Sequence, residues 1–403
     1  MRYGLLGKKL AHSYSPPIHR QLAGYDYELV ELATPAAVAD FLATTEAAGL
    51  NVTIPYKETV IPLCGELTPL ARRIGAVNTL SRLPDGRWRG DNTDYYGFAQ
   101  MWRGLDPRDR VVLLLGSGGA AKMARTFLTD AAAREVVAVS RSGAVNYENV
   151  YARADAEIVV NATPVGMYPH NGERLLDLTK FPRLRGVVEM IYHPDRTRLM
   201  LDAEALAIPA VGGLSMLVEQ AARAAEIWTG DKIDAEKSAA VTRRMRDAMR
   251  NIALVGMPGC GKTTVGKRLA ARLNREFIDT DVLVAERGGK PIPAIFADEG
   301  EEKFRQLESA VIAEVGKLSG KIIATGGGAV LRAENRDHLR QNSRVVYLLA
   351  PLAALATAGR PLSRDATALA AMFAVRDPLY RQTADECLDR DQAVAELELR
   401  VES

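Results

Sequence analysis

Residues 256–263 read GMPGCGKT and match the G-x-x-x-x-G-K-T pattern of a phosphate-binding loop. The apolar run 251–255 predicts a strand before the loop, and residues 264–273 predict a helix after it, which is the context that the pattern requires. In such a loop backbone N–H groups surround the phosphates, Lys262 reaches the outer ones and the Thr263 hydroxyl can ligate Mg²⁺. Cys260 is a small residue that the loop tolerates. We therefore expect a nucleotide site formed by Gly259, Cys260, Gly261, Lys262, Thr263 and Thr264.

Carboxylates, an acidic–basic pair and three glycines follow this loop. Residues 277–281 end a strand with Asp279 and Asp281 on the same side, so that one can contact Mg²⁺ through water and the other can accept a proton from a substrate hydroxyl. Arg305 and Glu308 share one face of a helix, although an ordinary surface ion pair would also explain them. The glycines at 326–328 follow a strand at 322–325 and let the backbone approach a ligand closely. This set is typical of phosphoryl transfer.

A second phosphate-type site is predicted in the first half of the chain. The apolar run 111–115 leads into GSGGAA at 116–121 and then into a helical stretch at 122–129. A strand, a glycine turn and a helix N-terminus form a pyrophosphate site, although tight turns after strands also favour glycine. The next strand, 135–139, ends in Ser140 and Arg141. Because an arginine there suits a ribose 2′-phosphate, the pattern favours NADP over NAD; the alternative is a surface arginine.

Polar residues gather upstream in compact clusters. Ser13 and Ser15 place two hydroxyls on a loop after the first strand, Asn51 and Thr53 point one way along a strand, and Lys57 follows the end of that strand. Asn78 and the stretch 91–94, which ends in Asp94, add amides and a carboxylate. Such a collection suits a ligand rich in hydroxyl groups. A lone lysine or aspartate is usually an ordinary surface residue, so the ligand site is inferred from the whole set of these polar residues.

The elements that position these residues alternate between strand-like and helical runs. We expect strands at 3–6, 27–32, 111–115, 135–139, 158–161, 187–190, 252–255, 322–325 and 345–348, and hence parallel sheets flanked by helices. A helix at 233–249 ends just before the strand of the phosphate-binding loop, so the two halves are joined almost directly. With 403 residues the chain exceeds one ordinary core, and two or three domains are expected.

Composition excludes several classes of protein. The formal charge of +2 gives no electrostatic case for binding nucleic acid or a membrane, and no apolar run is long enough for a membrane span. Three cysteines lack the spacing of a disulfide framework or a metal site. The first ten residues do not form a signal peptide. We expect a cytoplasmic protein with small-molecule partners, and the sequence leaves homo-oligomerisation open.

The clusters of the first half resemble the shikimate dehydrogenase family. His-Ser-x-Ser-Pro (12–16), Asn-Val-Thr-Ile-Pro-x-Lys (51–57), Gly-Ala-Val-Asn-Thr (75–79), Asn-Thr-Asp (92–94) and the glycine turn occur in that family's order, and 161–167, 190–194 and 213–220 agree with it. The resemblance spans about residues 1–248. It implies NADPH-dependent reduction of 3-dehydroshikimate to shikimate, with Lys57 and Asp94 as the catalytic pair. The substrate residues would be Ser13, Ser15, Asn51, Thr53, Asn78, Asp94, Tyr192 and Gln220. The NADP(H) residues would be Gly116, Ser117, Gly118, Gly119, Ala120, Ala121, Ser140, Arg141, Asn161, Ala162, Thr163, Met190 and Gly213.

Residues 251–403 resemble shikimate kinase through the phosphate-binding loop, Asp-Thr-Asp (279–281), Phe-Arg-x-x-Glu (304–308), the three glycines, Arg-Pro-Leu (360–362) and Arg-x-Pro-Leu-Tyr (376–380). The resemblance implies ATP-dependent phosphorylation of shikimate on its 3-hydroxyl. Asp281 would act as base and hold the substrate hydroxyls, with Arg305, Gly327 and Arg376 gripping the substrate. Arg360 would lie on a lid over the ATP phosphates. Mg²⁺ would be held by Thr263 and, through water, by Asp279.

Together these resemblances imply an α/β protein with a two-lobed dehydrogenase-like module that contains a Rossmann NADP domain, followed by a P-loop domain of the nucleoside monophosphate kinase type. We expect a substrate lobe at 1–103 completed by 213–249, a Rossmann domain at 104–212 and a kinase domain at 251–403. The chain departs from the families at Lys8–Leu10, at Pro69, in the short stretch after Arg141 and in a lid that lacks an extra arginine. The alternatives are a quinate-preferring, NAD-dependent first half, one half reduced to a regulatory ligand-binding module, or a P-loop regulator of protein partners.

Overall fold

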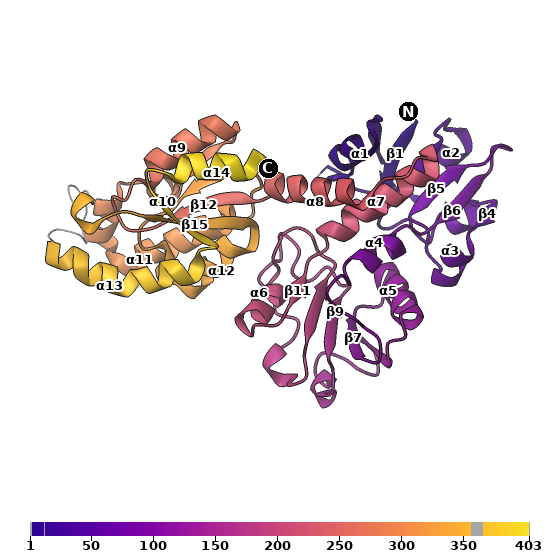
Figure 1. Cartoon of the computed structure of the whole chain (residues 1–403), viewed down its shortest axis with the longest axis horizontal. Coiled ribbons are helices and arrows are strands. Elements are labelled where there is room, and N and C mark those ends of the chain that lie inside the picture. The colour runs from indigo at the N-terminus through magenta and orange to yellow at the C-terminus, as the bar shows by residue number, and fades with distance from the viewer. Residues whose placement is uncertain (1, 12, 356–365, 403) are drawn as a thin grey trace. The chain divides into compact units, whose positions relative to one another are not determined.

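The computed structural model describes residues 2–11, 13–355 and 366–402 of the chain (Figure 1). Its contacts divide the chain into two compact units. The first comprises residues 1–192 together with Leu199–Met245, and the second comprises His193–Arg198 and the chain from Arg246 onward. The second unit therefore includes a short stretch that precedes most of it by about fifty residues in the sequence.

The first unit begins with a mixed six-stranded sheet in the order β2-β1-β3-β5-β6-β4 (Figure 1). Its strands are β1 (Tyr3–Gly7), β2 (Tyr27–Glu31), β3 (Gly49–Val52), β4 (Glu66–Leu67), β5 (Thr79–Arg82) and β6 (Trp88–Asp91). Its helices are α1 (Ser15–Ala23), α2 (Pro35–Thr44), the 3₁₀ turn η1 (Ile61–Leu63), α3 (Pro69–Ile74) and α4 (Asp94–Gln100).

This sheet differs from the expected all-parallel arrangement, because β5 runs antiparallel to both β3 and β6. Strands β5 and β6 are joined by a tight hairpin that contains Asp85 and Gly86, and Gly86 has a positive φ of 85°. An Asp-Gly pair between two extended runs is a hairpin signal that the sequence carried. The antiparallel pairing brings the start of β5 and the end of β6 to the edge where the parallel strands β1 and β3 end.

The second sheet of this unit is entirely parallel and has the order β11-β10-β9-β7-β8. Its strands are β7 (Val111–Leu115), β8 (Glu135–Val139), β9 (Ile158–Asn161), β10 (Gly186–Glu189) and β11 (Ala210–Val211). The helices are α5 (Gly119–Asp130), η2 (Val150–Ala152), η3 (Leu178–Lys180), α6 (Arg198–Ala205) and α7 (Leu214–Thr229), followed by α8 (Ala235–Met249). All five residues of β7 are buried, as expected for a central parallel strand.

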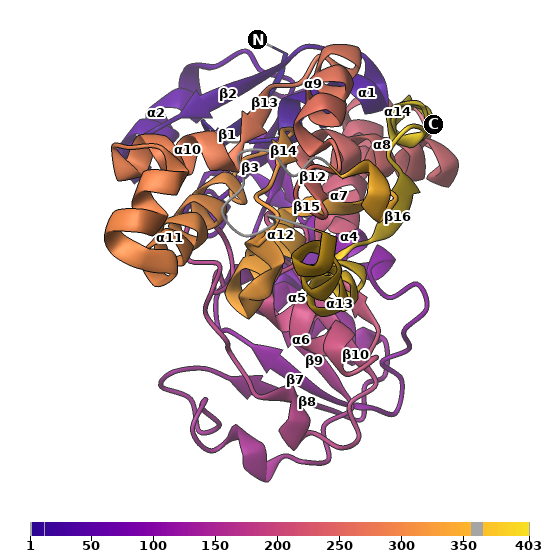
Figure 2. The same ribbon diagram turned by 90° about the vertical axis from the view of Figure 1, so that its left-hand side faces the viewer.

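The second unit is built on a parallel sheet in the order β13-β14-β12-β15-β16. Its strands are β12 (Asn251–Val255), β13 (Phe277–Asp279), β14 (Ile322–Ala324), β15 (Ser343–Leu349) and β16 (Glu386–Asp389). The helices are α9 (Lys262–Leu273), α10 (Thr280–Gly288), α11 (Ile292–Val315), η4 (Ala329–Leu331), α12 (Ala333–Asn342), η5 (Leu352–Ala354), α13 (Ala366–Thr383) and α14 (Ala393–Glu402). Helices α9 and α14 pack against each other (Figure 2).

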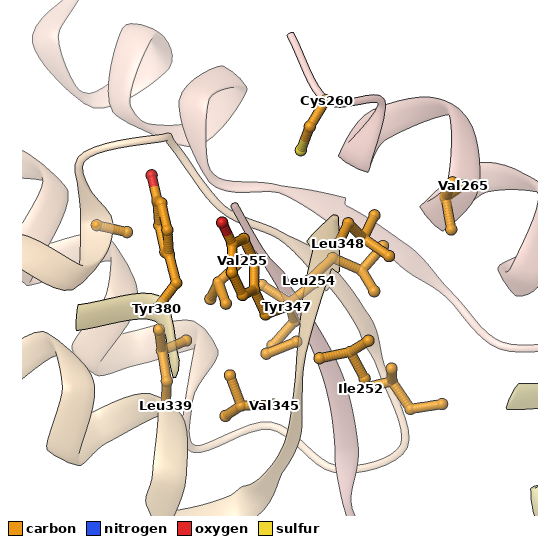
Figure 3. Close-up of a cluster of buried hydrophobic side chains, with 14 of the residues drawn as sticks. Ile252, Leu254, Val255, Cys260, Val265, Leu339, Val345, Tyr347, Leu348 and Tyr380 are labelled. Atoms are coloured by element: carbon orange, nitrogen blue, oxygen red, sulfur yellow. The ribbon is translucent and has the colours of Figure 1, made fainter. Parts of the chain in front are cut away.

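The core of the second unit lies on the central strands β12 and β15. Ile252 and Leu254 of β12 and Tyr347 of β15 are at most 2 % exposed and form one apolar cluster with Tyr380 of α13 (Figure 3). This cluster supports the phosphate-binding loop, which leaves the end of β12. Among the helices that the structure describes, none is long and apolar enough to cross a membrane.

Candidate active sites

A lysine–aspartate pair lies at the edge of the mixed sheet. Lys57 lies in the turn that follows β3, and its main-chain oxygen accepts a hydrogen bond from the Val77 N–H. Asp94 is the first residue of α4, directly after β6 and Asn92-Thr93. The Lys57 Nζ donates to Asp94 Oδ2 at 2.6 Å, and the two side chains are 24 % and 13 % exposed. Both groups are therefore held together yet remain accessible to a small ligand.

The topology brings most of the predicted substrate residues to this same edge. Ser13 and Ser15 follow β1, Thr53 follows β3 and donates its N–H to Leu6 at the end of β1, and Asn78 precedes β5. The Asn78 Nδ2 donates to Gln220 Oε1 of α7 at 3.4 Å. The Tyr192 ring meets the Tyr14 ring edge to face, with centroids 6.3 Å apart. Hydroxyl and amide groups next to the three strands β1, β3 and β5 thus lie near this edge, and Gln220 of α7 contacts one of them.

Asn51 lies in this region, but its amide bonds only to protein groups. Its Nδ2 donates to the Asn78 carbonyl oxygen at 3.2 Å and to Thr79 Oγ1 at 3.1 Å. Its Oδ1 accepts from Tyr27 OH at 2.7 Å and from His19 Nε2 at 3.1 Å. Two donor hydrogens and two acceptor positions are the full capacity of an asparagine amide. With a side chain only 4 % exposed in total, Asn51 has no hydrogen-bonding position left for a ligand.

The residues predicted to bind the dinucleotide follow the ends of β7, β8 and β9. Gly116 has φ 112°, and a Cβ there would lie 3.1 Å from the Ala162 oxygen, so the turn requires glycine. Gly118 caps α5, and a Cβ on this residue would have no other atom within 4 Å, so the N-terminus of α5 is open. The Gly116 N–H donates to Val139, so Ser140 and the exposed Arg141 lie beside the turn. An open helix N-terminus beside an arginine suits a phosphorylated dinucleotide.

Two further close contacts involve residues that were predicted to bind the cofactor. Gly213 approaches the Met190 carbonyl so closely that a Cβ would lie 2.1 Å from its oxygen. Asn161 is fully buried and bonded: its Nδ2 donates to both oxygens of Glu189, and its Oδ1 accepts from the N–H and hydroxyl of Thr163. Glu189 also accepts from the Ile191 N–H. Sequence reasoning missed Glu189, although a carboxylate inside the apolar run Gly186–Glu189 was a signal that it must be partnered.

In the second unit the phosphate-binding loop has the expected conformation. Gly256, Gly259 and Gly261 have φ values of 147°, 84° and 100°, which residues other than glycine rarely adopt. Lys262 begins α9 and its Nζ donates to the carbonyl oxygens of Gly256 and Met257 at 2.8 and 3.0 Å. Cys260 is completely buried in the core beneath the loop, so only its backbone can serve the nucleotide.

The predicted magnesium residues lie next to each other. Thr263 Oγ1 donates to Asp279 Oδ2 at 2.8 Å, and Asp279 Oδ1 caps α10 by accepting from the Asp281 N–H at 3.0 Å. The described part of the chain holds no cluster of three or more His, Cys, Asp or Glu residues fit for a metal ion. A Mg²⁺ ion at this place would therefore take most of its ligands from phosphates and water, as Mg²⁺ usually does in phosphoryl-transfer sites.

Each of the three consecutive glycines faces a different functional group. A Cβ on Gly326 would lie 2.6 Å from Asp281 Oδ1, one on Gly327 would lie 2.6 Å from Pro258 of the phosphate-binding loop, and one on Gly328 would lie 2.1 Å from Arg305 Nη1. The Gly327 oxygen accepts from Arg376 Nη1 at 3.1 Å. The glycines thus let Asp281, Arg305 and the phosphate-binding loop lie close together.

The Arg305–Glu308 pair is a buried ion pair and not a surface one. Arg305 Nη1 donates to Glu308 Oε2 at 2.7 Å, and the side chains are 8 % and 1 % exposed. Burial raises the pKa of Glu308, Arg305 opposes the rise, and the nearby Asp281 carboxylate adds to it. Arg305 is held on both sides, because its Nε and Nη2 also donate to Glu301 Oε1 at 3.2 and 3.0 Å, and its guanidinium borders Gly328.

A cavity of about 500 Å³ brings the predicted residues of this unit together. Of the predicted set it is lined by Gly259, Gly261, Lys262, Thr263, Thr264, Asp279, Asp281, Arg305, Gly327 and Arg376. Sequence reasoning missed its apolar wall, formed by Ile292, Pro293, Phe296, Phe304 and Met372. Gly300 interrupts α11 with a φ of 83°. The signal in the sequence was this glycine within a helical stretch, which indicates two helical segments that border the cavity. The predicted lid residue Arg360 lies outside the described residues.

The two units therefore define two classes of enzyme on one chain. The first unit has the fold and polar cluster of a nicotinamide-dependent oxidoreductase, and the second has the fold and cavity of a P-loop phosphotransferase.

Comparison with known proteins gives the families. The family descriptions "Shikimate dehydrogenase substrate binding domain" and "Shikimate 5′-dehydrogenase C-terminal domain" match residues 5–80 and 213–237, and "Shikimate kinase" matches residues 258–400. The NADP(+) shikimate dehydrogenase of Clostridium beijerinckii is 34 % identical over 253 residues, covering 58 % of this chain and 93 % of the relative. A shikimate kinase of Pseudomonas savastanoi pv. phaseolicola is 45 % identical over 152 residues, covering 36 % of this chain and 88 % of the relative.

Among solved structures, the shikimate 5-dehydrogenase of Thermus thermophilus in complex with NADP(H) and shikimate is 30 % identical, with a TM-score of 0.54, over 60 % of this chain and 99 % of that one. The chain belongs to the shikimate dehydrogenase family in its first unit and to the shikimate kinase family in its second. It is an enzyme of the shikimate pathway that combines the two activities.

Proposed function

We propose that the chain catalyses two consecutive reactions on one metabolite: NADPH-dependent reduction of 3-dehydroshikimate to shikimate, then ATP-dependent phosphorylation of the shikimate 3-hydroxyl. The observation that carries the proposal is that each unit keeps its own polar site, with the Lys57–Asp94 pair in one and the cavity around Lys262 and Asp281 in the other. We further propose that the substrate lobe, the Rossmann domain and the kinase domain are the three functional parts, in accord with the three separate sheets.

In the dehydrogenase the Lys57–Asp94 pair does the acid–base work. When bound, NADPH supplies the hydride. The ketone oxygen gains negative charge as hydride arrives at the carbon, and the Lys57 ammonium stabilises that charge and gives the oxygen a proton. Asp94, at 2.6 Å from Lys57 Nζ, keeps the ammonium pointed at the ligand and accepts from a neighbouring hydroxyl. The 2′-phosphate of the cofactor would pair with Arg141, and its pyrophosphate would lie at the N-terminus of α5.

The substrate of the dehydrogenase would be held by Ser13, Ser15, Thr53, Asn78, Tyr192 and Gln220. We propose that Asn51 does not contact the substrate but holds Asn78 and Thr79 in place, because all four hydrogen-bonding positions of its amide already bond to protein groups. The NADP(H) and shikimate named for the Thermus thermophilus structure support the same pair of ligands here.

In the kinase the groups are arranged for positioning and charge neutralisation, which matter most in phosphoryl transfer. Lys262 would exchange the two loop carbonyls for phosphate oxygens, and Thr263 with Asp279 fits a Mg²⁺ ion bound to those phosphates. Asp281 would take the proton of the attacking hydroxyl. Arg305 and Arg376 border the three glycines and suit the carboxylate of shikimate.

The test is a coupled assay with the purified full chain. With 3-dehydroshikimate and NADPH alone, absorbance at the NADPH band should fall and shikimate should accumulate. With Mg-ATP added, shikimate 3-phosphate should replace shikimate as the product. Oxidation of NADPH without phosphorylation, or phosphorylation of added shikimate without reduction, would refute the bifunctional proposal and leave one activity.

A further inference from the structure

A buried network of polar side chains lies behind the proposed dehydrogenase site. It begins at His19 of α1, which is fully buried, and passes through Asn51 and Thr79 to Thr93 and Asn78. The His19 ring is stacked on Tyr27, with centroids 4.0 Å apart, and lies near the Trp228 ring at 5.6 Å. None of His19, Tyr27 and Thr93 takes part directly in the proposed chemistry.

The hydrogen-bond directions in this network can be assigned from groups that can only donate or only accept. The main-chain carbonyl oxygen of Asn78 can only accept, so the Asn51 atom bonded to it must be Nδ2. Asn51 Oδ1 therefore faces His19 and Tyr27. His19 Nε2 must then carry a proton. Burial lowers the pKa of His19 to about 3, so the ring is neutral and Nδ1 accepts from the Tyr25 hydroxyl at 2.7 Å.

The far end of the network is fixed in the same way. The Thr93 main-chain N–H donates to Asn78 Oδ1 at 2.6 Å, and Thr93 Oγ1 lies 3.2 Å from the same oxygen. Thr79 Oγ1 accepts from Asn51 and lies 2.9 Å from Thr93 Oγ1. The oxygen of the Asn78 amide therefore points into the protein, and its NH₂ group points to Gln220 and the ligand region. Thr93 also precedes Asp94, the partner of Lys57.

We propose that His19 is a positioning residue of the dehydrogenase. As a neutral Nε2–H donor it holds Asn51, and Asn51 in turn holds Thr79 and the main-chain carbonyl of Asn78. The Asn78 amide thereby directs the N–H that is not bonded to Gln220 at an oxygen of the substrate. The network also fixes Thr93 at the start of the helix that carries Asp94. This inference rests on the proposed role of Asn78 as a substrate residue.

The test compares His19→Leu with His19→Gln in the full chain. Glutamine can place its amide near the position of Nε2 and donate to Asn51, whereas leucine cannot. Loss of one buried hydrogen bond corresponds to roughly a tenfold change in an equilibrium constant. We expect His19→Leu to raise the KM for shikimate about tenfold while the KM for NADP changes less than twofold, and His19→Gln to restore most of the loss.

A double-mutant cycle shows whether the effect passes through Asn78. In an Asn78→Ala background, His19→Leu should add less than a twofold change in the shikimate KM, because the group that it positions is gone. Tyr27→Phe removes only the second donor to Asn51 Oδ1 and should raise the shikimate KM in the same direction. Tyr151→Phe removes a tyrosine hydroxyl that bonds Asp177 elsewhere in the unit, and it should leave that KM unchanged.

The outcomes distinguish a failure of the proposed substrate role of Asn78 from a failure of the proposed positioning role of His19. If Asn78→Ala leaves the shikimate KM unchanged, the proposed substrate role of Asn78 is wrong and the inference falls with it. If Asn78→Ala raises KM but His19→Leu and Tyr27→Phe do not, the proposed function stands and the positioning role is refuted. NADPH binding, followed by fluorescence, checks folding of the unit; should His19→Leu fail to bind NADPH, Tyr27→Phe alone decides.

Discussion

Replacing Arg196 by methionine should destabilise the second unit, although about fifty residues separate Arg196 from the main part of that unit in the sequence. Arg196 belongs to the stretch His193–Arg198, which groups with this unit, and is 8 % exposed. Its guanidinium binds both oxygens of Asp385, at 2.8 and 3.2 Å, and the carbonyl oxygens of Arg340 and Ser343, at 2.7 and 3.0 Å. Asp385 also accepts from the Val345 N–H at the start of β15.

The magnitude follows from what the substitution leaves behind. Methionine fills much of the space but leaves a partly exposed carboxylate and two carbonyl oxygens without the guanidinium that they bind. Removing one partner of a buried ion pair costs about 3–5 kcal/mol. Because the Asp385 side chain is 31 % exposed and water can reach part of it, we take the low end, about 3 kcal/mol. In a unit of this size each kcal/mol lowers Tm by about 2–4 °C, so we expect a fall of about 6–12 °C.

The pH dependence of this loss has a defined sign. Burial raises the pKa of Asp385, but the Arg196 charge and hydrogen bonds and the Val345 N–H outweigh burial, so the pKa lies below its ordinary value. A carboxyl group with a lowered folded-state pKa stabilises the fold above its unfolded pKa of about 3.9, and this contribution is lost as pH falls through the folded-state pKa. The difference between Arg196→Met and the parent should therefore be largest at neutral pH and shrink below about pH 4.

The assay is calorimetry of the full chain, with the transition of the second unit identified by its upward shift on adding ATP. Arg198→Met is the matched control, because Arg198 lies in the same stretch and pairs with Asp337 with side chains that are 24 % and 33 % exposed. It should cost no more than about 1 kcal/mol. A Tm for Arg196→Met within about 2 °C of the control at neutral pH, where a difference of about 2 kcal/mol or roughly 4–8 °C is expected, would refute the assigned contribution of the Arg196–Asp385 pair.

Three further predictions concern the sites. Arg141→Asp should narrow or reverse the preference for NADPH over NADH by replacing a charge-assisted contact with repulsion; equal kcat/KM of the unmodified enzyme with both cofactors would contradict this. Gly328→Ala should raise the shikimate KM of the kinase by about tenfold or more and spare the ATP KM, since the new Cβ would lie 2.1 Å from Arg305 Nη1. Lys57→Ala should abolish reduction and spare phosphorylation of added shikimate, and Lys262→Ala should do the reverse; loss of both activities in a folded variant would exclude independent sites.

Sequence reasoning predicted the parts of the sites that depend on local backbone geometry. The phosphate-binding loop was readable because Gly256, Gly259 and Gly261 supply the positive φ values and Lys262 starts the helix, all within eight residues. The nine strands expected from apolar runs are present, with ends that differ by at most two residues. Apolar runs did not predict the short strand β16 or the β5–β6 hairpin, because half-buried, partly polar runs give weak apolar signals.

The roles of buried polar residues could not be predicted, for a physical reason. Burial of a polar group without a hydrogen bond is costly, so such a residue in a sequence implies that a partner exists, but it does not say where. Asn51, the partner of the His19 Nε2, is 32 residues away, and Asp385, the ion-pair partner of Arg196, is 189 residues away. Asn51 shows the consequence: its neighbours in the motif suggest a ligand contact, yet its four bonds are used inside the protein. Whether a polar residue of such a motif binds the ligand or holds another that does is decided by counting its hydrogen bonds in the folded chain, which is why the variants of His19 and Arg196 test the structure more sharply than those of the phosphate-binding loop.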